Sequence, residues 1–229
     1  MENVKQHFEA EAQEFDSIIL RLIPYYEQMV DALVLALPFG SAQPIRVIDL
    51  GCGTGTIARR IKDRYPQAQI TCVDIAEKML AIAQTKLGQG SDMRYQLANF
   101  EHYEFDAAYD IAVSSLALHH LVTDDDKLKF YKKIYAGLRP KGVFYNADVI
   151  LAASAHLQDL YMEKWQDYMR LNVSSEEVDQ KWLPAHYDED HPAKLMSQLD
   201  WLHHMGFVEV DVVWKYFNFA VYGGLKPAA

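Results

Sequence analysis

Three glycines in alternate positions mark the segment of this sequence with the clearest chemical use. Gly51, Gly53 and Gly55 directly follow an apolar segment at 45–50, and a run with helical spacing begins at Thr56. Glycine lets a ligand lie against the backbone and accepts the positive φ angles that a tight turn needs. Such turns between a strand and a helix usually hold nucleotides, so we expect a nucleotide-like ligand; a tight turn without a ligand is the alternative.

The spacing of these glycines separates two kinds of nucleotide. A dinucleotide fingerprint is G-x-G-x-x-G, with the pyrophosphate at the helix N-terminus. Here position 56 is Thr and the third glycine comes one residue early, which argues against NAD and favours a ligand without a pyrophosphate. Asp74 ends the next apolar segment, about 20 residues further on, where a carboxylate can bind the ribose hydroxyls.

His119 and His120 are the candidates for a catalytic general base, because they follow the apolar segment 109–115. Ligands of open α/β sheets bind at the carboxyl ends of the strands, where this pair would lie. A base is needed only where the nucleophile must lose a proton, and packing or capping is an equal alternative for either histidine. His203 and His204 are weaker candidates, since adjacent residues of a helix point in different directions. Aromatic residues that could wall a substrate pocket, with core packing as their alternative, are Tyr26, Trp165, Tyr168, Trp182 and Phe217.

Residues with metal-binding side chains show no convincing zinc spacing. The most crowded set is His186, Asp188, Asp190 and His191. A polar loop before a helix explains that set better than a metal centre does. Cys52 and Cys72 lie in or beside apolar segments, where a buried thiol is the default. We therefore expect no metal site and no disulfide framework, as in a reducing cytoplasm.

Apolar strands and amphipathic helices alternate from residue 45 to residue 151. We expect strands at 45–50, 70–75, 93–97, 109–115 and 143–150, helices at 56–65, 77–87 and 123–137, and a turn at 138–142. This alternation implies right-handed crossovers and a mostly parallel sheet with helices on both faces. The expected fold class is α/β, a Rossmann-like doubly wound sheet.

Helices precede and follow this alternating region. We expect them at 4–16, at 25–37 after Pro24, at 154–171, after a capping box at 174–177, and at 192–205 before Gly206. The last two strands, 207–216 and 217–225, predict an antiparallel hairpin at the sheet edge. The expected organisation is one domain over 1–229, with a helical N-terminal cap at 1–40 and a helical lid at 151–205.

The composition excludes several classes of function. The net charge of −10 over 229 residues argues against a direct nucleic-acid partner. The polar start lacks the apolar stretch of a signal peptide. No apolar run approaches the ~20 residues that span a bilayer, so no membrane partner is expected. These features predict a cytoplasmic protein with a small-molecule substrate, and they leave a homodimer open.

Two motifs resemble those of class I S-adenosylmethionine (SAM) dependent methyltransferases. They are DLGCGTG at 49–55 and VDIAEKML at 73–80, while DIAVSSLALHHL at 110–121 and LRPKGVFYNAD at 138–148 resemble later regions of the family. The family's third region often reads G-D-A, where this chain has Ala98-Asn99-Phe100, an amide in place of an acid. The resemblance covers nearly the whole chain and implies SAM as cofactor. The residues it implies at the cofactor are Gly51, Cys52, Gly53, Asp74, Ile75, Met79, Asn99, Phe100 and Ser115 or its neighbour Ser114.

The two ends of the chain resemble a narrower group within that family. HFEAEAQEFD at 7–16, LIPYYEQM at 22–29, SSEEVDQKW at 174–182 and KYFNFAVYGGLK at 215–226 are similar to carboxy-SAM synthases and their unassigned bacterial relatives. Tyr26 matches the tyrosine with which those enzymes bind the cofactor. They hold its extra carboxylate with an arginine, where this chain has Trp182. A neutral indole cannot form the bidentate charged pair that a carboxylate needs, so the departure favours plain methyl transfer.

We therefore expect a SAM-dependent methyltransferase that acts on a small molecule. One alternative is a carboxy-SAM synthase, which acts on SAM itself and serves tRNA modification. A non-catalytic SAM-binding protein and an NAD-dependent oxidoreductase are the others. The motifs do not identify the acceptor, because one fold supports many substrates.

Overall fold

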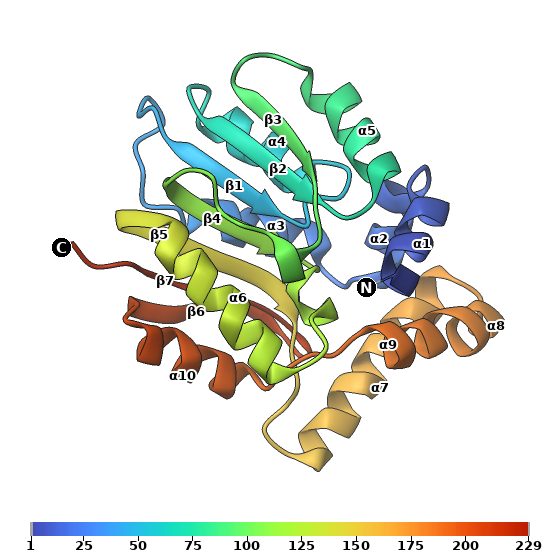
Figure 1. Ribbon diagram of the computed structural model, residues 1–229. Coiled ribbons are helices and arrows are strands. Elements are labelled where there is room, and N and C mark those ends of the chain that lie inside the picture. Colours follow the sequence, from blue (N-terminus) through green and yellow to red (C-terminus); the bar gives the residue numbers. More distant parts are fainter. Residues whose placement is uncertain (1, 229) are drawn as a thin grey trace.

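A seven-stranded sheet forms the centre of the computed structural model, which describes residues 2–228 (Figure 1). The strand order is β3-β2-β1-β4-β5-β7-β6. The first five strands in this order run parallel, and β7 runs antiparallel to both of its neighbours, β5 and the edge strand β6. This confirms the doubly wound α/β fold and the terminal hairpin. The strands are β1 Arg46–Leu50, β2 Gln69–Asp74, β3 Met93–Leu97, β4 Tyr109–Ser115, β5 Leu138–Val149, β6 Val208–Tyr216 and β7 Phe219–Leu225.

Helices cover both faces of the sheet, which explains why β1 and β2 are buried after their first residue. On one face α3 (Tyr26–Leu35) packs beside α4 (Thr56–Arg64), and α4 beside α5 (Glu77–Leu87). On the other face α6 (Asp124–Gly137) packs against α10 (Leu195–Met205). Each face has its own apolar core, so side chains that alternate along a strand enter different cores.

The remaining helices gather at the carboxyl ends of the parallel strands (Figure 1). We call α1 (Glu2–Glu11), α2 (Phe15–Leu22), α7 (Ala155–Asn172), α8 (Ser175–Glu177) and α9 (Leu183–Glu189) the end helices, together with the π-helical turn Val178–Trp182. Trp165 in α7 donates its indole N–H to the carbonyl of Leu22 (2.8 Å), and Tyr168 donates its hydroxyl to the carbonyl of Leu20 (2.7 Å). These bonds join helices that lie far apart in the sequence.

Helix ends follow the predicted signals closely. Thr123 caps α6 by accepting from the N–H of Asp126, and the capping box opened by Ser174 is complete. After α10, Gly206 has a φ of 100°, and the N–H of Phe207 bonds to the carbonyl of Leu202 (3.1 Å). The predicted helix end at Gly206 is therefore confirmed as a Schellman motif.

Four predicted boundaries were wrong. The helix expected at 4–16 is two helices, with a bend at 12–14 that buries Ala12 against α5. Residues 138–142 are the irregular start of β5 and not a separate turn, because Leu138 already pairs with Tyr109 while Lys141 takes a φ of 65°. The helix expected from 192 begins at Leu195. His186 and Asp188, expected in a polar loop, lie in α9, and only Asp190 and His191 follow it.

Among residues 2–228, no helix has the length and apolarity to cross a lipid bilayer.

Candidate functional site

The glycine turn sits at the carboxyl end of β1, and its conformation explains the residue types. Gly51, Gly53 and Gly55 have φ values of 72°, 52° and 85°, which disfavour any residue with a Cβ. A Cβ on Gly51 would lie 2.2 Å from the Cβ of Ala117. The N–H of Gly51 donates to the carbonyl of Val73 (2.8 Å), which holds the turn against the end of β2. The turn is therefore tightly packed on one side and free to meet a ligand on the other.

A cavity of about 730 Å³, including space open to solvent, lies beside this turn. We call it the first cavity. It is bounded by the ends of β1, β2 and β4, by α1 and α2, and by the start of α3. Its lining residues are Val4, Phe8, Phe15, Tyr26, Gly51, Cys52, Gly53, Thr54, Thr56, Ile57, Asp74, Ile75, Met79, Ala98, Phe100, Ser115, Leu116, Ala117 and His120.

All the residues predicted to contact the cofactor line the first cavity, with the exception of Asn99. Asn99 lies between two lining residues, Ala98 and Phe100, but is not itself part of the wall. Of the two candidate serines, Ser115 lines the cavity, whereas Ser114 is fully buried and donates its hydroxyl to the carbonyl of Leu50 (2.7 Å). The structure thus brings together residues that the sequence distributes over 26–115.

The charge of the first cavity is negative. Asp74 is the ionisable acid in its wall, and the residues that line it include no Lys or Arg. Its carboxylate accepts from the backbone N–H groups of Gly53 (2.8 Å) and Ala76 (2.9 Å). Burial raises the pKa of Asp74, although those two bonds favour the charged form. A cavity of this charge suits a cationic ligand and repels a pyrophosphate.

Two buried polar atoms in the wall have no hydrogen-bond partner in the described part of the chain. They are the hydroxyl of Ser115 and Nε2 of His120. Buried polar groups are normally paired, so unpaired ones in a cavity wall indicate atoms that a ligand would contact. SAM fits this wall, since it carries a positive sulfonium, an ammonium group and several polar groups but no phosphate.

Asp49 is a residue that sequence reasoning passed over. It is fully buried in β1 behind the glycine turn and pairs in register with Cys72 of β2. Burial, with a further contribution from the Asp74 charge, raises the pKa of Asp49 to about 7. A carboxyl group in an otherwise apolar strand was the available signal, and its burial favours the neutral acid beneath the turn.

A second cavity, of about 760 Å³, adjoins the first. Four residues line both: Phe8, Phe15, Leu116 and His120. The rings of Phe8 and Phe15 meet edge to face, with centroids 5.9 Å apart, and Phe8 meets the His120 ring at 5.6 Å. The other lining residues are His7, Glu11, Ile18, Ile19, Leu22, Ile23, His119, Val149, Trp165, Met169, Trp182, Ala185, His186, Glu189 and Asp190.

The wall of the second cavity is apolar on one side and charged on the other. Ile18, Ile19 and Leu22 of α2 and the indoles of Trp165 and Trp182 form the apolar side, so two of the predicted aromatic residues line this cavity. Tyr26 lines the first cavity. Tyr168 and Phe217 line neither, because Tyr168 bonds to Leu20 and Phe217 packs on other aromatic rings at the sheet edge.

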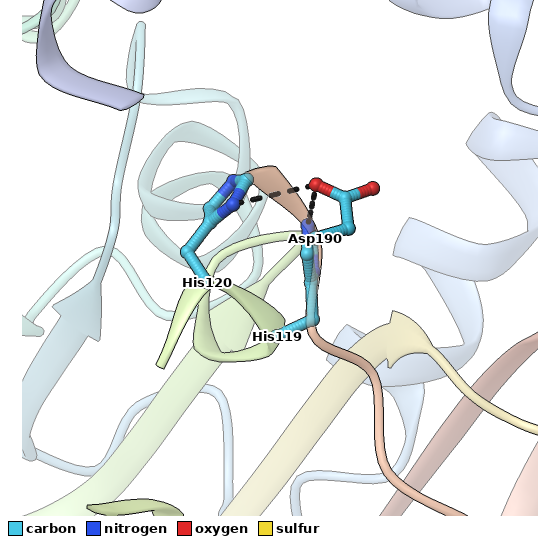
Figure 2. A group of neighbouring side chains, drawn as sticks. All are labelled: His119, His120 and Asp190. Atoms are coloured by element: carbon cyan, nitrogen blue, oxygen red, sulfur yellow. Dashed lines mark ion pairs between the residues drawn. The ribbon is translucent and has the colours of Figure 1, made fainter. Parts of the chain in front are cut away.

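His119 and His120 are adjacent and both face Asp190 (Figure 2), but their other neighbours differ. His119 stands between two carboxylates, with Nδ1 2.5 Å from Asp148 and Nε2 3.3 Å from Asp190. Burial disfavours its charged form, yet both carboxylates together raise the pKa of His119 to about 10. Burial and the His119 charge lower the pKa of His120 to about 3. His119 is therefore an imidazolium at neutral pH, and His120 is neutral.

Asp190 connects these histidines to the end helices. Its second oxygen accepts from Nδ1 of His186 (2.7 Å). Further along the same wall, His7 of α1 lies 2.9 Å from Glu189 and 3.0 Å from Glu11. The bond to Glu11 is the main cause that raises the pKa of His7 to about 9. A charged network thus links α1 to α9 across the second cavity.

Comparisons with known proteins agree with this geometry. Residues 47–142 match a family model described as a methyltransferase domain. A carboxy-S-adenosyl-L-methionine synthase of Nautilia profundicola is 23% identical over 216 residues, covering 94% of this chain and 92% of that protein. A malonyl-[acyl-carrier protein] O-methyltransferase of Geobacter sulfurreducens is 36% identical over 105 residues, or 45% of this chain and 39% of that protein. In fold, the chain resembles the solved DhpI-SAM-HEP complex with a TM-score of 0.65 and 21% identity, covering 97% of this chain and 95% of that one.

Proposed function

We propose that this chain, which belongs to the class I SAM-dependent methyltransferases, binds SAM in the first cavity and methylates a small molecule held in the second. The observation that carries this proposal is the shared wall. Because Phe8, Phe15, Leu116 and His120 line both cavities, ligands bound in the two cavities would be neighbours. Methyl transfer needs donor and acceptor sites that adjoin in this way.

The first cavity divides into parts that suit the parts of SAM. We assign the ribose hydroxyls to Asp74 and the adenine to the apolar side chains of Ile75 and Met79, with Phe100 beyond them. Gly51, Cys52 and Gly53 would contact the methionine and ribose along the turn, with Ser115 and Tyr26 as polar partners. Asn99 is assigned to the edge of the adenine through its backbone position between two wall residues.

Bound SAM supplies an electrophilic methyl group on a positive sulfur. The chain's own part is to align the acceptor with that group and to exclude water. The end helices form the outer walls of both cavities, so we propose that they act as the lid expected at 1–40 and 151–205. His120 is the histidine that would touch both ligands. His119, held by two carboxylates, acts as a positioning residue.

The second cavity supports methyl transfer over carboxymethyl chemistry. Its lining residues include three carboxylates, Glu11, Glu189 and Asp190, and no Lys or Arg, while its cationic histidines, His7 and His119, are already paired with these carboxylates. Trp182 occupies the wall where an arginine would be needed, and its buried indole N–H is a single neutral donor. The extra carboxylate of carboxy-SAM would meet no bidentate partner there. The acceptor is therefore proposed to be an apolar molecule with a neutral or cationic polar group.

Titration calorimetry with SAM, its demethylated product and NADH tests the cofactor assignment. We expect the first two to bind with a stoichiometry of one and NADH not to bind. Mass spectrometry of ligand retained through purification distinguishes SAM from the heavier carboxy-SAM, and recovery of carboxy-SAM would favour the synthase. Tight SAM binding with no turnover of any acceptor in a broad screen would favour a non-catalytic protein.

The cellular setting is part of the same proposal. Cys52 and Cys72 are buried and unpaired, in keeping with the cytoplasmic location expected from the sequence. The homodimer and the absence of a nucleic-acid partner stay predictions, and light scattering and a gel-shift assay would test them.

A further inference from the structure

We propose that His119, His120 and Asp190 form a binding site for a divalent transition-metal ion in the wall of the second cavity (Figure 2). The ion would bind an oxygen of the acceptor, so this part of the proposal rests on the function proposed above. The three residues come from the turn after β4 and from the segment after α9. Each offers one ligand atom, and the three atoms lie within 4.8 Å of one another.

The distances within this group fit the edges of a coordination shell better than hydrogen bonds. One oxygen of Asp190 lies 3.3 Å from Nε2 of His119 and 3.4 Å from Nδ1 of His120. Both distances exceed the ~2.7–3.2 Å of an N–H···O hydrogen bond. Ligands bound at ~2.0–2.1 Å around a tetrahedral ion stand roughly 3.3 Å from one another. The two distances to Asp190 are therefore those expected around an ion, and the two histidine nitrogens lie no more than 4.8 Å apart.

Outer residues orient the proposed ligands in the manner of known metal centres. Nδ1 of His119 is held by Asp148 at 2.5 Å, which directs the opposite nitrogen toward Asp190. An ion bound at Nε2 would displace the proton that the imidazolium carries there, so its binding would release a proton. The second oxygen of Asp190 accepts from Nδ1 of His186 at 2.7 Å. A carboxylate behind a metal-binding histidine and a donor behind a metal-binding carboxylate are the usual supporting contacts. These two bonds have ordinary or short lengths, in contrast to the long distances inside the group.

An unpaired buried nitrogen is a second, independent observation. The ring of His120 is only 7% exposed, and its Nε2 has no partner in the described part of the chain. Its Nδ1 lies 3.4 Å from Asp190 and donates its proton to the carbonyl of Glu189 (3.2 Å), since a carbonyl can only accept. Binding of an ion at Nδ1 would break this bond and move the proton to Nε2, which would then be the ring's donor.

The ligand set indicates the class of ion and of substrate. Two imidazoles and one carboxylate, without thiolate, are typical of Zn²⁺ and of Fe²⁺ or Mn²⁺ sites with open positions. All three residues line the second cavity, so the open positions face the acceptor. A bound cation there would favour an acceptor with a hydroxyl group and would help that group lose its proton.

Zinc titration of the metal-free protein, against a chromophoric chelator, tests the site without reference to activity. We expect one tight equivalent in the wild type, roughly 100-fold weaker binding in Asp190→Asn, and 10- to 100-fold weaker binding in His186→Gln. The matched control is His203→Gln with His204→Gln, two histidines at the exposed end of α10, which should bind as the wild type does. Co²⁺ in place of zinc should give visible absorption bands in the wild type and not in Asp190→Asn.

Other results would overturn the proposal. It is wrong if the wild type takes up no tight equivalent, if Asp190→Asn binds equally well, or if the control variant loses the site. Each of these would leave an ion-pair network in place of a metal centre. The metal-free protein is titrated with SAM in parallel. A protein that binds SAM but takes up no zinc refutes this inference alone. Zinc binding without SAM binding refutes the proposed function instead. If Asp190→Asn does not fold, His119→Gln takes its place.

Discussion

Asp74 is the residue on which the proposed SAM site depends most, and Asp74→Asn tests it with little change in side-chain size. One carboxylate oxygen accepts from Gly53 and the other from Ala76. An amide keeps one of these bonds and turns its NH₂ group toward the other N–H. The same change removes the charge that would accept both ribose hydroxyls.

The expected loss of affinity follows from these bonds. A hydrogen bond to a charged group contributes about 1.5–3 kcal/mol. The substitution removes the charge of Asp74 and disturbs the hydrogen bond from the Gly53 N–H to this side chain. Together these changes should weaken the free energy of SAM binding by about 3 kcal/mol. Since 1.4 kcal/mol is a factor of ten, the dissociation constant should rise roughly 100-fold. Leaving one buried N–H unpaired should also lower the free energy of unfolding by about 1–3 kcal/mol.

Calorimetry with SAM measures the first effect and thermal denaturation the second. The matched control is Asp63→Asn, an exposed carboxylate on α4 whose side chain is 65% exposed. It should leave SAM affinity unchanged. A folded Asp74→Asn protein that binds SAM as tightly as the wild type would refute the assignment of the ribose to this carboxylate.

Three further outcomes are expected from the structure. In urea denaturation, Gly51→Ala should lower the free energy of unfolding by several kcal/mol more than Gly88→Ala does. Both glycines have a positive φ, but a Cβ on Gly51 would clash with Ala117, whereas a Cβ on Gly88 would meet open space. The contribution of Asp49 to the free energy of unfolding should fall by up to about 4 kcal/mol as pH rises from about 4 to about 7, because its raised pKa makes the folded state bind more protons than the unfolded state. The lowered pKa of His120 acts in the opposite direction over this range, so the Asp49 contribution is measured as the difference between the wild type and Asp49→Asn at each pH. A difference that does not change with pH would contradict it. Because the pKa of His7 is raised to about 9, the ion pair of His7 with Glu189 stabilises the contact between α1 and α9 fully below pH 6.5 and is lost as pH rises through about 9. Hydrogen-exchange protection of the α1 amides should therefore fall above pH 9 in the wild type. In His7→Gln it should already be low at pH 7.

Local patterns in the sequence were enough for the sheet and for most of the first cavity. The glycine turn, Asp74, Ile75 and Met79 belong to two consecutive strand–helix units, and their relative positions follow from the regular geometry of such units. Strand burial, helix caps and the terminal hairpin depend on neighbouring residues in the same way, and each was confirmed. Ser115 could not be separated from Ser114, because only the direction of each side chain distinguishes them.

Packing between distant segments decided the rest. The bend at 12–14 exists because Ala12 is buried against α5, and it brings Phe8 and Phe15 together in the wall between the cavities. Asp190 reaches His119 only because the end helices return to the carboxyl edge of the sheet. Helical and strand periods are set by residues a few positions apart, whereas these contacts depend on which apolar faces fit against one another across the whole chain. For that reason the second cavity, the charged network and the proposed metal site could not be derived from spacing along the chain.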